Sequence, residues 1–549
     1  MISFTTALVL FTVSITSIYT TLLLLAKSKP KIVTAGRGKG FSSTLSIGAF
    51  ALSSIGLALT LLTNFRETLP YFIIIILIPI LVTASRVFGG YSLDLTSIIL
   101  WHIIMYFGKA PYIDVSVGEG SRMVREMRLN DHWDFKWAHN PHYNPIPTIA
   151  FIQATLSRLT DVPWYSYMLG TTIFLIWAIA YDLTIYRLTY ILTNSSIASL
   201  ISIILIAVTP ETAIHQHPYQ WSGNMLTLLA LISIIKVLKE GLNIRKTIII
   251  LTILFTGSIL SHATGLSLLI LSAFLFFSKE IISALRKFSL VIEESRFRLP
   301  MSIPLIFLAI FLFRTTYTSG YAGYVLPNLI TVYDGFIDFL KEFFIPNEKE
   351  LSGAYHIPLY ERAGVSPIQA YVWSFVIATA TAHIIYDLLK RKIEEIKILL
   401  YIATIFMISI SFIGYAIVKL KEFYVLNRTT YVFIPYIIPL AAEAIAITIS
   451  KRSRVIALIS LVLLAISAPI ASQDPNISPI QYARIRGSHT IEITPTLYLK
   501  AEILSLLANT SIYESLYLYS NTYFIKAVVY TSQGLKTGYI YSSDLREVI

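Results

Sequence analysis

The feature that most constrains this chain is a series of apolar runs, each long enough to cross a lipid bilayer, that recurs from the first residues to about residue 470. A membrane-spanning helix needs roughly 20 apolar residues to cross about 30 Å of hydrocarbon. Runs such as 248–260 and 398–418 are apolar on every face, unlike the alternating segments of a transmembrane β-barrel. The sequence therefore predicts an all-α polytopic membrane protein.

The balance of residue types supports this fold class and rules out a water-soluble globular protein of this size. Hydrophobic residues make up 55% of the 549 residues and charged residues only 13%. We expect about fourteen transmembrane helices. The expected spans are 3–26, 41–63, 68–85, 91–107, 165–187, 196–209, 223–238, 247–261, 264–278, 300–317, 367–389, 397–418, 430–450 and 455–471.

The basic residues predict which side of the membrane each connection faces. They gather after odd-numbered spans, in segments 27–39, 236–246, 279–298, 390–397 and 451–454. Because Lys and Arg accumulate in cytoplasmic loops, both termini are expected to be extracytoplasmic in a multi-pass protein of the cell membrane. The net charge of +12 then mostly reflects the membrane topology, because the basic loops face anionic membrane lipid. It does not indicate a nucleic-acid partner.

The connections on the opposite side are long, and loops of more than about 15 residues are seldom idle spacers. The longest are 108–164, 318–366 and the tail 472–549. We expect three parts: additional N-terminal spans in 1–90, a transmembrane body in 91–471, and a small extracytoplasmic α/β cap in 472–549. The cap is expected from a helical segment near 497–508 followed by three short β-prone runs, at 516–519, 527–530 and 538–541.

The first long loop carries the residues that we expect to be catalytic. Its segment 120–129 places Met123, Val124 and Met127 on one helical face, as in a helix lying on the membrane surface. Glu119 precedes this helix, where the helix dipole favours a carboxylate at the height of lipid headgroups. Asp114 is the second candidate, and the structural alternative for Glu119 is an ordinary pairing with Arg122 three residues later.

Several short motifs resemble the C-type glycosyltransferase (GT-C) superfamily, whose multi-span members take a sugar from a polyprenyl-phosphate or polyprenyl-pyrophosphate carrier. The motifs are Glu119, the helix 121–130, Tyr143-Asn144-Pro145-Ile146-Pro147, Leu159-Thr160-Asp161-Val162-Pro163, Ser261-His262-Ala263-Thr264-Gly265 and Asn427-Arg428-Thr429-Thr430-Tyr431. The resemblance covers 91–450 and implies a GT-C-like fold. It also implies a polyprenyl-phosphate-linked sugar as donor and a glycan, lipid or protein acceptor. The tail lacks the Trp-Trp-Asp-Tyr-Gly signature of oligosaccharyltransferases, which argues against transfer of a whole oligosaccharide to asparagine.

The expected substrate-binding residues are those that can hold a phosphate or a sugar hydroxyl. They are Arg122, His142, Tyr143, His215, His217, His262, Arg314 and Arg428. Arg428 presents a planar fork that matches phosphate, although an arginine at a helix end can also simply reach the interface. The histidines at 139, 142, 215 and 217 can alternatively converge on a divalent metal, a cofactor that the spacing allows but does not require.

Two other function classes stay open. A transporter or flippase of lipid-linked glycan would need charged groups inside the membrane, and the expected spans contain few acids: Asp94, Asp182, Asp387 and Glu443. These acids form no sequential relay, so the sequence favours the enzyme. The second alternative is a non-catalytic cell-envelope protein that organises surface polymers through its outer loops.

Overall fold

The computed structural model consists mainly of helices. The residues that it describes are 4–25, 39–62, 69–87, 92–107, 124, 127, 130, 148–161, 167–209, 218–241, 244–261, 265–287, 292–293, 299–317, 367–390, 393–418, 424–451, 518–520 and 537–539.

The helices before and just after the first long loop are α1 (Phe4–Leu25), α2 (Lys39–Leu62), α3 (Leu69–Val87), α4 (Leu93–Phe107), α6 (Thr148–Thr160), α7 (Tyr167–Thr193) and α8 (Ser196–Val208). The later helices are α9 (Pro218–Glu240), α10 (Ile244–Ser261), α11 (Leu266–Phe276), α12 (Ser278–Arg286), α13 (Ser302–Tyr317), α16 (Pro367–Leu389), α17 (Glu395–Val418) and α18 (Tyr424–Lys451). Four short strands accompany them: β1 (Ile292–Glu293), β2 (Ile393–Glu394), β3 (Leu518–Ser520) and β4 (Thr537–Tyr539).

These helices agree in position with the apolar runs of the sequence. A helix overlaps every expected span up to residue 450, whereas the span expected at 455–471 lies outside the described residues, so the count of fourteen stays a prediction. In the described parts of the chain, five helices are long and apolar enough to cross a membrane, namely α2, α3, α9, α16 and α18. The chain is an all-α membrane protein.

One expected span has a different shape from the prediction. The run 264–278 reads as a single helix in the sequence, but α11 ends at Phe276 and α12 starts at Ser278 after a bend of 56°. Phe277 occupies the bend and is exposed. In α12, Ile282 is buried while the charged side chains on either side of it are exposed. This pattern is typical of a helix that lies along a surface.

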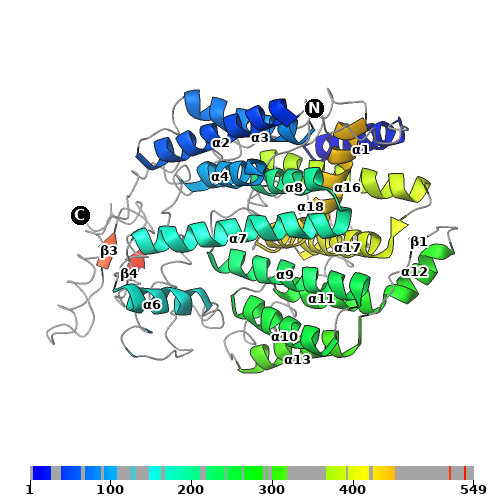
Figure 1. The fold of residues 1–549 in the computed structure, drawn as a ribbon. Helices are drawn as coiled ribbons and strands as arrows, with labels where there is room; N and C mark the ends of the chain where they lie inside the picture. The colour runs from blue at the N-terminus through cyan, green and yellow to red at the C-terminus, as the bar shows by residue number, and fades with distance from the viewer. Residues whose placement is uncertain are drawn as a thin grey trace, which may run out of the picture.

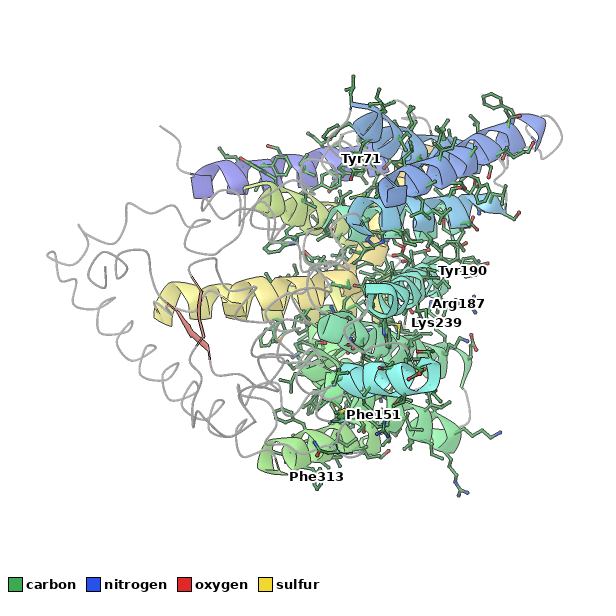
Figure 2. All side chains as sticks on the ribbon, turned by 90° about the vertical axis from the view of Figure 1, so that its left-hand side faces the viewer. Tyr71, Phe151, Arg187, Tyr190, Lys239 and Phe313 are labelled. Carbon is green, nitrogen blue, oxygen red and sulfur yellow. The ribbon has the colours of Figure 1, made fainter. Side chains whose placement is uncertain are left out.

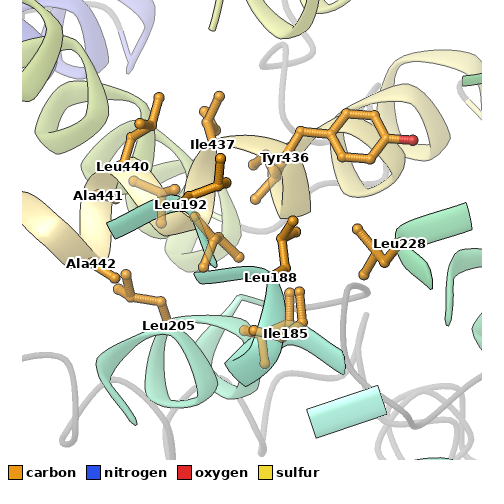
Figure 3. Packing of buried hydrophobic residues seen from close by; sticks show 14 of the residues in the cluster. Ile185, Leu188, Leu192, Leu205, Leu228, Tyr436, Ile437, Leu440, Ala441 and Ala442 are labelled. Atoms are coloured by element: carbon orange, nitrogen blue, oxygen red, sulfur yellow. The ribbon is translucent and has the colours of Figure 1, made fainter. Parts of the chain in front are cut away.

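Helix α18 forms the centre of the packed body. It packs against α16 and α17, which precede it directly, and against α7 and α8, which lie much earlier in the sequence. Figure 3 shows Ile437 and Leu440 of α18 packed near Leu188 and Leu192 of α7, whereas the ring of Tyr436 points away from these leucines. Helix α8 is almost entirely buried against these neighbours, so its thirteen residues do not need the length of a lipid-facing span.

The N-terminal helices are joined by hydroxyl groups and small side chains. Ser42 of α2 donates a hydrogen bond to the carbonyl oxygen of Ser85 in α3 at 3.1 Å, and Ser53 of α2 donates to that of Ser97 in α4 at 3.1 Å. The indole of Trp101 in α4 donates to the carbonyl oxygen of Ile75 in α3 at 2.7 Å. Such contacts are expected between helices in lipid, where apolar burial alone does not drive association.

The bundle has two distinguishable ends. Figure 1 shows α6, β3 and β4 at one end and α12 with β1 at the other. We call the first the loop end and the second the basic end, because the described parts of the basic connections 236–246, 279–298 and 390–397 lie there. Strands β1 and β2 pair in parallel and thereby join two of these connections, with Ile292 opposite Ile393.

The C-terminal tail is described only in two short strands. Strands β3 and β4 pair in parallel, with Leu518 opposite Thr537. They overlap two of the three β-prone runs in the sequence, while the run at 527–530 and the helix expected near 497–508 lie outside the described residues. The α/β cap and the division of the chain into three parts stay predictions.

Candidate functional site

Most of the expected site residues lie outside the described residues. These are Asp114, Glu119, Arg122, His142, Tyr143, His215, His217 and His262. Arg314 lies in α13 and Arg428 in α18, but the structure does not describe their side chains. The roles assigned to all ten residues stay predictions, and the described residues define the scaffold around them.

The end of the first long loop is anchored by α6. This helix packs against α7, α9 and α10, with Ala150, Ala154 and Ser157 buried at the contact and Phe151 and Leu159 exposed. The sequence predicts a helix over 148–159, and α6 agrees with that prediction. The loop therefore starts at the end of α4 and finishes on a helix that is fixed against the bundle.

Three described residues fall in the segment that the sequence assigns to a surface helix. Val124, Met127 and Asn130 are helical. Val124 and Met127 are buried, and Asn130 is exposed. Val124 and Met127 are thus covered by other parts of the protein and are not open to a membrane surface, so the surface helix and the place of Glu119 at its start stay predictions.

The connection that contains His262 is held by a close contact between α10 and α11. A Cβ atom on Gly265 would lie 2.7 Å from a side-chain carbon of Ile259 and 3.1 Å from its backbone nitrogen, so no larger residue fits without movement. Ser258 of α10 lies 2.6 Å from the hydroxyl of Thr227 in α9 and donates to the carbonyl oxygen of Gly223 at 2.9 Å. Both ends of this short connection are therefore fixed.

Two buried ionisable residues meet between α4 and α7. Nδ1 of His102 lies 2.8 Å from Oδ1 and 3.0 Å from Oδ2 of Asp182, and both side chains are fully buried. Asp182 lies eleven residues before the end of α7, which is roughly three helical turns from the basic end. A carboxylate at this depth needs a partner, and His102 supplies it.

A larger group of charges meets near the basic end. We call it the α16–α18 charge cluster, and it consists of His383, Asp387, Glu394, Lys397, Glu443 and Lys239. Oε2 of Glu443 lies 2.9 Å from Nε2 of His383 and 2.8 Å from Nζ of Lys397. Oδ2 of Asp387 lies 3.5 Å from the same His383 nitrogen. The cluster thus joins α16, α17 and α18 through one shared carboxylate.

The cluster continues toward the surface through β2 and α9. Nζ of Lys397 lies 3.7 Å from Oε1 of Glu394, whose Oε2 lies 3.0 Å from Nζ of Lys239. Lys239 also donates to the carbonyl oxygen of Ile191 at the end of α7. Figure 2 shows Lys239 beside Arg187 and Tyr190 of α7.

Sequence reasoning singled out Asp182, Asp387 and Glu443 but did not find their partners. The partners come from other helices. Lys397 is 46 residues from Glu443 in the sequence, and His102 is 80 residues from Asp182. One local signal was available, because His383 and Asp387 are four residues apart and so share a face of α16. The remaining contacts depend on helix packing.

No group of three or more metal-ligating side chains occurs among the described residues. The histidines at 139, 142, 215 and 217, which the sequence offers as metal ligands, lie outside them. A divalent metal therefore stays a prediction that depends on those histidines alone.

No protein-family model matches the sequence, and no curated protein matches it. Among solved structures, the chain is similar to the crystal structure of the oligosaccharyltransferase from Archaeoglobus fulgidus in its apo form, with a TM-score of 0.45 and 13% sequence identity. The alignment covers 86% of this chain and 65% of that one, so the chain matches less than two thirds of the length of this protein.

Proposed function

We propose that the chain is a multi-pass membrane glycosyltransferase of GT-C type. It moves a sugar from a polyprenyl-phosphate carrier to a glycan, lipid or protein acceptor on the outer membrane face. The observation that carries this proposal is the separation of the connections between the two ends of the bundle. The basic connections are joined at one end by β1, β2 and Lys239, and α6, the helix that ends the first long loop, lies at the other.

In this proposal the chemistry takes place on one side of the membrane, and the separation of the two ends supports it. Because basic loops face the cytoplasm, the loop end faces outward, together with both termini. Activated nucleotides are absent outside the cell, and the sequence contains no glycine-rich phosphate loop to bind one. A donor carried by a membrane lipid fits this arrangement, because it presents its phosphate at the level of the loop.

The proposed chemistry is a single displacement at the sugar carbon. Glu119 acts as general base and removes the proton of the acceptor hydroxyl as its oxygen attacks. The bond to the carrier phosphate breaks, and Arg428 stabilises the negative charge that develops on the leaving phosphate. Direct displacement inverts the configuration of the sugar carbon.

The test is transfer of a labelled sugar from polyprenyl phosphate in proteoliposomes. Glu119→Gln should lower the rate by about 10²–10⁴-fold, the usual contribution of one general base. The matched control is Asp131→Asn, which removes an acid from the same loop and should leave the rate near that of the wild type. If Asp114→Asn abolishes transfer and Glu119→Gln does not, Asp114 is the base. Normal turnover in both variants would exclude the proposed site.

One observation favours a second function, a flippase or transporter of lipid-linked glycan. Buried ionisable residues meet inside the bundle at His102 with Asp182 and at His383 with Glu443 and Lys397. Transporters commonly carry such groups along their pathway. Movement of a labelled lipid-linked glycan between leaflets of protein-containing vesicles, lost in Asp182→Asn, would support this function over transfer.

A further inference from the structure

One face of α7 is exposed from residue 176 to residue 190. The exposed side chains recur every three or four residues, so they share one face of the helix. We call this face the α7 stripe, and it consists of Ile176, Ile179, Leu183, Arg187 and Tyr190. The two isoleucines and the leucine are 39% to 57% exposed. Because α7 overlaps the expected span 165–187, this apolar face is placed against lipid acyl chains.

Arg187 is the charged member of the α7 stripe. It lies six residues before the end of α7 at Thr193, which is about 9 Å along the helix from the basic end. The expected span ends at this residue, so the arginine lies near the boundary between acyl chains and headgroups. Its guanidinium carbon is 5.8 Å from the centroid of the Tyr190 ring, a contact that helps to hold the guanidinium on the exposed face.

The charge of Arg187 has no carboxylate partner among the residues that the structure describes. Other cations of the bundle do have one. Nε of Arg86, near the end of α3, lies 2.8 Å from Oδ2 of Asp94. Nζ of Lys239, which lies beside Arg187 in Figure 2, is 3.0 Å from Oε2 of Glu394. A guanidinium on a lipid-facing surface needs an anion, and its planar fork matches a phosphate.

A second copy of the chain is a poor occupant of the α7 stripe. In a symmetric membrane dimer the twofold axis runs along the membrane normal, so equivalent residues of a shared face lie at the same depth. The stripe contains one arginine and no acid, and the two arginines would repel each other where lipid lowers the dielectric constant. A lipid phosphate instead supplies the missing negative charge, and its acyl chains match the apolar side chains.

We propose that the α7 stripe binds a phospholipid with an anionic headgroup, from the leaflet at the basic end. Arg187 donates hydrogen bonds from its fork to the phosphate oxygens, and Tyr190 holds the guanidinium in place. An acyl chain lies along Leu183, Ile179 and Ile176. The site goes beyond the proposed glycosyl transfer and does not depend on it, because the donor of that reaction is proposed to bind at the loop end.

Photocrosslinking in nanodiscs tests the proposal. The full chain is placed in phosphatidylcholine nanodiscs that contain phosphatidylglycerol with a photoreactive acyl chain, and mass spectrometry locates the crosslinks. We expect crosslinks at Ile179 and Leu183. Unlabelled phosphatidylglycerol should compete for this position, whereas inorganic phosphate should not. Equal competition by inorganic phosphate would assign the site to free phosphate and overturn the lipid proposal.

Substitutions of Arg187 test the role of its fork. Arg187→Gln should lower the affinity for phosphatidylglycerol, measured by the same competition, by about tenfold or more, as expected for a charge-assisted hydrogen bond. Arg187→Lys keeps the charge but loses the fork, so it should bind several-fold more weakly than the wild type. Both substitutions change an exposed side chain and should leave the protein folded. Arg86→Lys is the matched control and should bind normally, because Asp94 already occupies this arginine.

Lys239→Gln separates a defined site from general attraction to a basic surface. Lys239 is paired with Glu394, so its loss should weaken binding less than Arg187→Gln does. Wild-type affinity in Arg187→Lys, or an equal loss in Lys239→Gln and Arg187→Gln, would show that surface charge alone attracts the lipid and would overturn the site. Disulfide formation between two copies of Leu183→Cys would show that a second copy covers the stripe, which would also overturn the proposal.

Discussion

The two ends of the bundle are built differently. At the basic end the connections are short and tied by specific contacts: α7 and α8 are separated only by Asn194 and Ser195, and β1 pairs with β2. At the loop end, about forty residues separate α4 from α6 and about fifty separate α13 from α16. The contrast indicates that packing fixes the basic end, whereas the loop end offers the sequence length that the proposed recognition and chemistry would use.

The largest expected effect concerns the sidedness of the two ends. The chain has no cysteine, so single cysteines can be introduced at the exposed positions Lys287 on the basic end and Leu159 on the loop end. A membrane-impermeant maleimide should label position 159 only from outside the cell and position 287 only from the cytoplasmic side. Accessibility of both positions from one side would contradict the division into two ends.

The second prediction separates buried from exposed charges at the basic end. Glu443→Ala leaves His383 and Lys397 buried without their shared acceptor and should destabilise the protein by about 3–5 kcal/mol. Glu394→Ala removes the carboxylate of a side chain that is 39% exposed, together with its pairs to Lys239 at 3.0 Å and to Lys397 at 3.7 Å. Because Lys397 keeps its closer partner Glu443, the change should cost less than about 1 kcal/mol. Unfolding in mild detergent measures both. Equal losses would show that burial does not distinguish the two carboxylates.

The smallest expected effect concerns phosphate recognition at the loop end. Arg428→Lys keeps the positive charge but loses the planar fork, so affinity for a polyprenyl-phosphate carrier should fall by about 1–2 kcal/mol. Binding of the carrier to the protein in nanodiscs measures this change. Arg286→Lys on α12 is the matched control at the basic end and should bind normally. Wild-type affinity in Arg428→Lys would leave this arginine as a helix anchor.

The sequence predicts the helices well because each apolar run is sufficient by itself to specify one. Local signals also mark some helix ends. Asn194 and Gly241 have positive φ angles of 51° and 66° and follow α7 and α9, as expected of residues that tolerate this conformation after a helix. The bend between α11 and α12 was not predicted, because the apolar run continues through Phe277 without glycine or proline.

The contacts among buried charges were beyond sequence reasoning for a different reason. Glu443 is one acid in an apolar span, and nothing near it in the sequence indicates that it meets His383 and Lys397. Their meeting depends on the register between three helices, which a single sequence does not encode locally. The residues expected to be catalytic lie in connections that carry no such apolar pattern, and Glu119 and Asp114 stay predictions from motif and position.

Because α18 comes after α7, α8, α16 and α17 in the chain, the helix at the centre of the packed body is the last of these to be synthesised. Helices are released from the ribosome from the N-terminus onward, so α7, α8, α16 and α17 are made before α18. Until α18 arrives, Lys397 lacks the carboxylate of Glu443 at 2.8 Å and has only that of Glu394 at 3.7 Å. A charge in a nascent span costs up to about 3 kcal/mol on insertion, and the weaker pairing offsets less of this cost. A chain truncated before residue 424 would keep this charge and would leave uncovered the apolar faces of α16, α17, α8 and α7 that α18 packs against.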